Sequence, residues 1–212
     1  MTKIQDITFD QIQACYKKFG FRFFHSDVKN YNVNLWGIRS EDLETDEYND
    51  VIGISWQHKG KVYHHVFKAT TDPGLYYMKN PMSVNGSALM VHNQQYQGAL
   101  MAGKHNPGKP TEHQAFRQIK PMKYWRDNDR NNYRDVEKGK IYEAIYYTNL
   151  HSRQPNKAML ATIGKTSAGC QVVQSPKDFH SILIPIRDKA VSNWGPTFTY
   201  TLFFERDIKE LL

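Results

Sequence analysis

The sequence has few cysteines and no long apolar run, and each absence excludes a class of protein. Only Cys15 and Cys170 occur among its 212 residues, so a framework of several disulfides is excluded. No stretch approaches the ~18 consecutive apolar residues of a membrane span, which predicts a chain without a transmembrane segment. The first residues lack a basic head followed by an apolar stretch. We therefore see no secretory signal and expect the chain to be cytoplasmic as synthesised.

The composition suits one folded domain. Hydrophobic residues make up 40% of the chain, including 13 Tyr and 11 Phe, which is enough for one core. No internal repeat or linker divides the sequence. We predict a single domain over residues 1–212, with an N-terminal helical extension over 1–30 and a core over about 31–212. The net charge of +7 favours an acidic partner such as nucleic acid, an anionic membrane or a cell wall, although a basic protein without such a partner could have the same charge.

Two segments have the patterns of helices. Residues 8–19 begin with Thr8 as a cap, complete a capping box with Gln11, and place apolar side chains at helical spacing. Cys15 lies beside that apolar stripe, so we interpret it as a small buried hydrophobic residue. Residues 175–190 form the second predicted helix, which Pro185 must kink or split.

Four other segments are rich in β-forming residues: 51–57, 61–70, 141–151 and 197–205. Lys59-Gly60 between the first two predicts a hairpin turn. Residues 71–113 are rich in Gly, Pro and Asn, so we expect a long irregular region that is functional or mobile. The predicted fold class is mainly β, a β-rich α+β domain with an N-terminal helix and a later helix.

The segment most indicative of chemistry lies between residues 147 and 173. A predicted strand ends in His151-Ser152, and Ser167-Ala168-Gly169-Cys170 precedes the second helix. A cysteine nucleophile needs a base for its proton, a group that orients that base, and backbone N–H groups for the oxyanion. Cys170 could be the nucleophile and His151 the base. A carbonyl just after the histidine could orient the ring, and the Ser167–Gly169 loop could build the oxyanion site.

This segment resembles the catalytic signature of the L,D-transpeptidases of the YkuD type. That signature is a His, about fifteen residues, and then Ser or Thr, any residue or His, Gly and Cys. The resemblance covers about a quarter to a third of the chain. It implies Cys170 as nucleophile, His151 as base, and the backbone carbonyl of Ser152 as the group that orients the imidazole. It also implies a single L,D-transpeptidase-like catalytic domain, with the second helix following the nucleophile.

The implied substrate is the stem peptide of peptidoglycan, cleaved or joined through a thioester. The chain has Ala168 where the family usually has His, and Gln171-Val172 where it usually has an apolar residue and then Asn or Arg. With the upstream Thr-Thr-Asp-Pro-Gly, the Ser-Ala-Gly-Cys-Gln-Val variant resembles a divergent branch from phages and prophages. For this branch we expect cell-wall degradation by an endolysin or effector that reaches the wall after release or export.

Other residues suggest roles in substrate binding or metal binding. Arg126 could hold a stem-peptide carboxylate, and His105 in a Gly/Pro-rich loop could face the substrate. Residues 127–135 resemble a calcium loop in their D-x-D-x-N-x-x-x-D spacing. We interpret them first as an acid–base-paired surface loop, and leave cation binding open.

Two alternatives to a cysteine enzyme stay open. Nine histidines allow a zinc-dependent wall hydrolase, although no H-E-x-x-H pair occurs. Aromatic pairs among basic residues allow a non-catalytic binding module for wall glycan or nucleic acid. We assign no metal ligand and no cofactor, and we expect a monomer that binds peptidoglycan rather than nucleic acid, because no nucleic-acid-binding motif is present.

Overall fold

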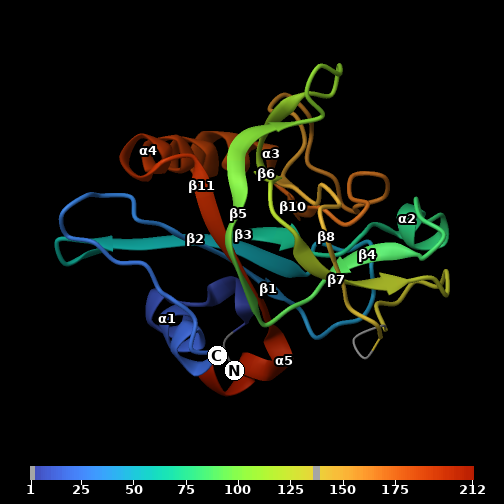
Figure 1. The fold of residues 1–212 in the computed structure, drawn as a ribbon, viewed down its shortest axis with the longest axis horizontal. Coiled ribbons are helices and arrows are strands. Elements are labelled where there is room, and N and C mark those ends of the chain that lie inside the picture. The colour runs from blue at the N-terminus through green and yellow to red at the C-terminus, as the bar shows by residue number, and fades with distance from the viewer. Residues whose placement is uncertain (1–2, 136–138) are drawn as a thin grey trace.

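Eight strands close into a barrel in the computed structural model, which describes residues 3–135 and 139–212 (Figure 1). The strand order around the barrel is β1-β11-β5-β6-β9-β10-β3-β2. The barrel strands are β1 (Asn34–Arg39), β2 (Asp50–His58), β3 (Lys61–Thr70), β5 (Gln94–His105), β6 (His113–Gln118), β9 (Leu150–His151), β10 (Gln171–Val173) and β11 (Thr197–Phe204). The predicted mainly β class is confirmed.

A small second sheet and several short helices surround the barrel. The sheet has the order β4-β7-β8, with β4 at Ser87–Met90, β7 at Met122–Asp127 and β8 at Tyr142–Ala144. The helices are α1 (Phe9–Lys18), α2 (Leu75–Lys79), α3 (Pro176–Asp178), α4 (Ile184–Trp194) and α5 (Glu205–Ile208). Single helical turns are η1 (Ile4–Asp6), η2 (Phe179–Leu183) and η3 (Lys209–Leu211). None of the helices in the described ranges is long and apolar enough to span a bilayer.

Two cores hold these layers together. The larger core fills the barrel and extends under α4, with Leu35, Phe116 and Tyr200 among its fully buried members. In the smaller core, Ile12 and Tyr16 of α1 pack with side chains of β1, β2, β11 and α5. Figure 1 accordingly shows α1 and α5 together at one end of the barrel and α4 at the other. The N-terminal segment thus packs against the barrel wall.

Three local predictions are confirmed. Thr8 and Gln11 form the capping box at the start of α1, and Cys15 is fully buried. Residues 50–58 and 61–70 form a hairpin in which Lys59 and Gly60 both have positive φ, as a two-residue turn of type I′ requires. Ser175 caps the later helical region through the N–H of Asp178.

The later helix is divided as its proline predicts. Helical backbone runs from Pro176 to Trp194, but Phe179–Leu183 forms a π-helical turn just before Pro185. A proline has no N–H to donate and its ring crowds the preceding turn. The wider π turn accommodates this misfit without ending the helix.

Two predictions about strands were wrong. Residues 71–113 were expected to be irregular, yet they contain α2, β4 and the twelve-residue β5. Gln, Gly and Asn weaken the β pattern of residues 93–98, but pairing of Gln94, Gln95 and Tyr96 with β11 overrides it. Residues 141–151 were expected to form one long strand. They instead form β8 and β9, separated by irregular backbone in which Tyr147 has a φ of +57°.

A buried group of charges lies beneath the segment that follows β3. Nε of Arg39 lies 3.0 Å from Oδ1 of Asp72, and Nε of Arg134 donates to Oδ2 of Asp72 at 3.0 Å. Asp50 accepts hydrogen bonds from the backbone N–H and the hydroxyl of Thr71. Burial, and then the charge of Asp72, raises the pKa of Asp50 to about 6. Through these ion pairs and hydrogen bonds, β1, β2 and the loop after β3 are joined to one another and to residue 134.

Candidate active site

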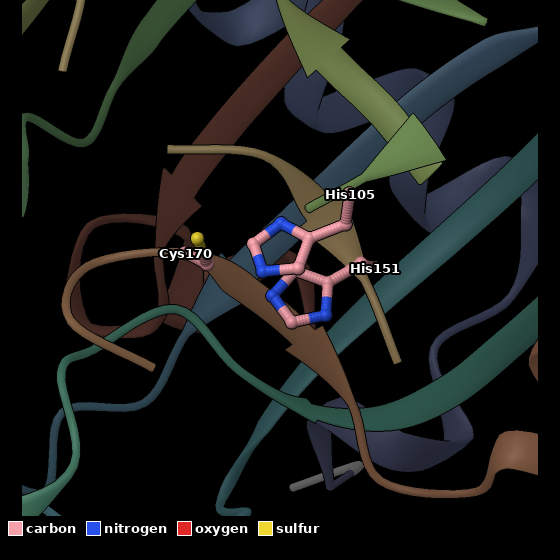
Figure 2. Close-up of side chains that lie close together, drawn as sticks. All are labelled: His105, His151 and Cys170. Atoms are coloured by element: carbon pink, nitrogen blue, oxygen red, sulfur yellow. The ribbon is translucent and has the colours of Figure 1, made fainter. Parts of the chain in front are cut away.

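The predicted nucleophile and base meet in an open cleft of about 780 Å³. The cleft lies where the ends of β5 and β6 approach β9 and the loop that precedes β10. Strands β9 and β10 pair in parallel with Val172 opposite His151, which places Cys170 beside the start of β9. A ring nitrogen of His151 lies within 4.8 Å of the Cys170 sulfur. Figure 2 shows the His151 and His105 rings stacked beside that sulfur.

The tautomer of His151 is set by its neighbours. Its Nδ1 lies 2.7 Å from the Ser152 carbonyl oxygen, which can only accept, so Nδ1 carries the proton. The hydroxyl of Ser152 donates to the carbonyl of Val173 and fixes the Ser152 residue in place. Nε2 of His151 is therefore the basic nitrogen. It is buried and has no hydrogen-bond partner among the described residues, so its lone pair is available to accept a proton.

His113 supports the same tautomer. Its Nδ1 donates to the carbonyl of Thr111 at 2.8 Å, which leaves Nε2 as an acceptor. That Nε2 lies 3.3 Å from Nδ1 of His151. The proton on Nδ1 of His151 is thus shared between the carbonyl of Ser152 and the ring of His113. The sequence alone had given no role to His113.

His105 has the opposite tautomer, and Asn149 sets it. The backbone N–H of Gln118 donates to Oδ1 of Asn149, so the Asn149 amide group must present Nδ2 to His105. Nδ2 of Asn149 lies 3.0 Å from Nδ1 of His105 and can only donate to it. Neutral His105 therefore carries its proton on Nε2. The cleft contains one imidazole that can accept a proton and, stacked on it at 4.0 Å between ring centroids, one that can donate a hydrogen bond.

The resting site is uncharged. Burial raises the pKa of the Cys170 thiol to about 11, and the backbone of Asn149 offsets part of that rise. Burial, followed by the nearby rings of His105 and His113, lowers the pKa of His151 well below its usual value of 6.5. The thiol donates to the carbonyl of Tyr147 at 3.8 Å rather than to His151. A thiolate–imidazolium pair is thus not the resting form, and the proton would move only as the sulfur turns and attacks.

Hydrogen bonds of Ser167 and the glycine at position 169 fix the backbone conformation of the loop before Cys170. The hydroxyl of Ser167 donates to the carbonyl of Cys170 and accepts from the N–H of Gly169. Gly169 has a φ of +128°, and a Cβ there would lie 2.7 Å from the carbonyl oxygen of Ala88, so glycine is required. The N–H of Gly169, one of the backbone groups of the loop predicted to build the oxyanion site, donates to Ser167 in this geometry.

Gln171, which departs from the family pattern, has a structural role. Its side chain is buried, donates to the carbonyl of Thr71 at 3.3 Å and accepts from the hydroxyl of Tyr200 at 3.1 Å. The nucleophile strand is thereby tied to β11 and to the segment after β3. The N–H of Gly74 in that segment donates to the carbonyl of Ser167. Ala168 lines the cleft without a polar group.

Arg126 does not line the cleft, so its predicted contact with substrate is not found. Its guanidinium donates to the carbonyl of Gly86 and lies 3.9 Å from the centre of the Tyr146 ring. Tyr146 does line the cleft, so Arg126 contacts a residue of the cleft lining without belonging to the lining itself. Five basic residues that the sequence did not single out line the cleft instead, and no acidic residue is among the lining residues. They are Lys104, Lys109, Arg117, Arg153 and Lys165.

A shared metal ion fits this geometry poorly. One ligand atom each from His105, His151 and Cys170 lies within 4.8 Å of the others. However, the two rings are stacked with an angle of 16° between their planes. Imidazole lone pairs lie in the ring plane, so those of two parallel rings run side by side and do not converge on one ion at the ~2.0–2.1 Å that zinc requires. The proton on Nε2 of His105 also occupies the nitrogen that would have to bind.

No family model, curated protein or solved structure matches the chain closely enough to indicate a relative. The resemblance to L,D-transpeptidases therefore stays a prediction that depends on the spacing of His151, Ser152 and the Ser167–Cys170 loop. The arrangement of the site has to be interpreted from its own geometry.

Proposed function

We propose that the protein is a cysteine-dependent acyl-transfer enzyme that acts on stem peptides of peptidoglycan. The observation that carries this proposal is that a ring nitrogen of His151 lies within 4.8 Å of the Cys170 sulfur, while Nε2 of that ring has no partner among the described residues and the Ser152 carbonyl holds the proton on Nδ1. A buried imidazole nitrogen without a partner is costly unless it serves a ligand or a reaction. The sequence resemblance to the L,D-transpeptidases of the YkuD type supports the same reaction.

The reaction would proceed in two balanced halves. Nε2 of His151 takes the thiol proton while the sulfur forms a bond to the substrate carbonyl carbon, giving a tetrahedral oxyanion. Collapse breaks the C–N bond, and the leaving amine takes the proton from His151, which leaves a thioester on Cys170. Water or a second amine then attacks the thioester while Nε2 of His151 takes the proton of the attacking group. Collapse breaks the C–S bond, and His151 passes that proton to the departing sulfur, which restores the thiol.

His105 is suited to stabilise charge during both halves. Its Nε2–H is set as a donor by Asn149, its side chain lines the cleft, and its ring lies beside the sulfur in Figure 2. A pre-oriented donor at the developing oxyanion is worth ~10²–10³ in rate when it is well placed. The N–H of Gly169 already donates to Ser167. His105 would therefore donate the side-chain hydrogen bond that stabilises the oxyanion.

The charge of the cleft favours this class of substrate. Several Lys and Arg side chains line the cleft and no Asp or Glu does, so a ligand with free carboxylates is attracted. Peptidoglycan stem peptides carry such carboxylates on their acidic and terminal residues. Within this class, cell-wall cleavage by an endolysin-like protein is the outcome that the sequence resemblance favours, and water would then resolve the thioester.

The test is to incubate the protein with purified peptidoglycan and analyse both partners by mass spectrometry. We expect shortened or released stem peptides in solution, and an acyl adduct on Cys170 when the reaction is quenched in acid. Cys15 is a matched internal control, because its thiol is fully buried and burial raises its pKa to about 12. Peptidoglycan left intact, with no adduct on Cys170, would contradict the proposal.

The pH dependence tests the role of His151 separately. Because burial and neighbouring histidines lower the pKa of His151 below 6.5, the ring remains a neutral base at pH values where an ordinary histidine is protonated. We expect kcat/KM to be retained from neutral pH down past 6.5 and to fall only as the pH drops through the lowered pKa of His151. An acid limb centred at or above pH 6.5 would show that another group, or a solvated histidine, is the base.

A further inference from the structure

Three carboxylates converge where β7 ends, and none of them belongs to the lining of the cleft. One oxygen each from Asp127, Asp129 and Asp135 lies within 4.8 Å of the other two. Carboxylates at this spacing repel one another, so an arrangement of this kind needs compensation by a proton or a cation.

Asp127 is the unusual member of this group. Its side chain is 0% exposed, and neither carboxylate oxygen has a hydrogen-bond partner of good geometry among the described residues. Burial, and then the charges of Asp129 and Asp135, raises the pKa of Asp127 to about 7, although the Asp129 backbone offsets a part of this. Buried carboxylates without partners are rare because desolvation is costly. Asp127 therefore points to a missing ligand.

The arginines of this segment do not supply the compensation. Arg134 directs its guanidinium to Asp72 and to the carbonyls of Ser40 and Asp42. Arg126 is bonded to Gly86 and stacked on Tyr146, and Arg130 is exposed. Over residues 3–135 and 139–212, no Lys or Arg forms an ion pair with any of the three carboxylates. The three carboxylates are therefore not paired with basic side chains of the described residues, as an acid–base-paired loop would require.

The spacing of the oxygens suits calcium. Ca²⁺ binds six to eight oxygen ligands at ~2.3–2.6 Å, so two ligands on opposite sides of the ion lie about 4.6–5.2 Å apart. The oxygens here fall within that limit. Asn131 lies between the acidic residues, and its Nδ2 now donates to Asp129 at 2.6 Å and to Asp135 at 3.4 Å. A half-turn of this amide would present its oxygen to an ion at the same place, in exchange for the hydrogen bond that Oδ1 now accepts from the N–H of Tyr133.

We propose that Asp127, Asp129 and Asp135, together with the amide oxygen of Asn131, bind one Ca²⁺ ion. The ion would join the end of β7 to residue 135. The intervening loop already contacts the segment after β1 through backbone bonds from Thr45 to Asn132 and from Arg134 to Leu43. Ca²⁺ would therefore tie this edge of the small sheet to the barrel. The proposal is independent of the cysteine chemistry.

The test is calorimetric titration of the chelator-treated full chain with Ca²⁺ alone, followed by thermal unfolding with and without the ion. We expect one ion per chain and a rise in Tm on saturation. Asp127→Asn should weaken Ca²⁺ binding by at least about tenfold, since a charged ligand is lost. The same variant should unfold at a higher temperature than the wild type when no ion is present, because it removes a buried charge that is repelled by two others.

Matched variants keep the test decisive. Asp188→Asn removes an acidic group on α4 that is 58% exposed and should leave Ca²⁺ binding unchanged. Cys170→Ala should also bind Ca²⁺ like the wild type, so failure of the enzyme proposal and failure of this one can be told apart. No binding at millimolar Ca²⁺, or equal binding by wild type and Asp127→Asn, would overturn the proposal.

Discussion

Replacing Cys170 by alanine is expected to reduce the release of stem peptides from peptidoglycan by about 10⁴-fold or more, because no other side chain in the cleft can form the thioester. His151→Ala should cost about 10²–10⁴-fold, since the thiol, with a pKa raised to about 11 by burial, loses the base that accepts its proton. The two residues act in one step, so the double variant should be no slower than Cys170→Ala. Initial rates of muropeptide release, measured by chromatography, provide the comparison.

Cys15→Ala is the control for this prediction. Cys15 lies in the smaller core with α1 and far from the cleft lining, so its removal should leave the rate close to that of the wild type. Circular dichroism would show that each variant is folded. If folded Cys170→Ala retained most of the activity, the nucleophile assignment would be wrong, and a non-catalytic binding module would become the better interpretation.

The largest expected effect on stability comes from Asp72→Ala. Asp72 is 3% exposed and lies between Arg39 and Arg134, which are 0% and 1% exposed. Removing the carboxylate leaves two guanidiniums buried with less compensation, a change that typically costs ~3–5 kcal/mol in the free energy of unfolding. Urea unfolding followed by fluorescence of the four tryptophans would measure this loss.

Asp188→Ala is the matched control for stability, because Asp188 also pairs with an arginine but is 58% exposed. Its removal should cost less than about 1 kcal/mol. Equal losses for Asp72→Ala and Asp188→Ala would show that the buried pairs contribute no more than a surface pair. Because the carbonyl of Thr71 binds Gln171 of the nucleophile strand, we also expect Asp72→Ala to lower activity in the fraction that stays folded.

Features encoded over a few neighbouring residues could be predicted from the sequence. The capping box of Thr8 and Gln11, the turn at Lys59-Gly60 and the irregular helical turn before Pro185 each depend on local stereochemistry, and the structure has all three. The proximity of His151 and Cys170 could also be predicted, because the spacing of the motif places both on or beside the paired strands β9 and β10.

Features that depend on strand pairing across the barrel could not be predicted. His113 reaches His151 because β6 pairs with β9 through Phe116 and Leu150, and nothing in the local pattern shows this. The orientation of Asn149 follows from its bond to the backbone of Gln118. Arg126 was predicted to contact substrate because its sequence position precedes the expected catalytic strand. Residues 145–149 instead leave the small sheet, and Tyr146 covers the arginine.

The barrel closes by pairing β1 in parallel with β11, so that Leu35 lies opposite Tyr200. During synthesis on a ribosome, β1 and β2 emerge long before the strand that completes them, and their edge stays open until residues 197–204 have been made. Pairing of segments so distant in the chain is slow, because the intervening loop must be closed first. The cleft at β5, β6 and β9 should therefore form late, and a nascent chain should acquire its chemistry only once translation has passed β11.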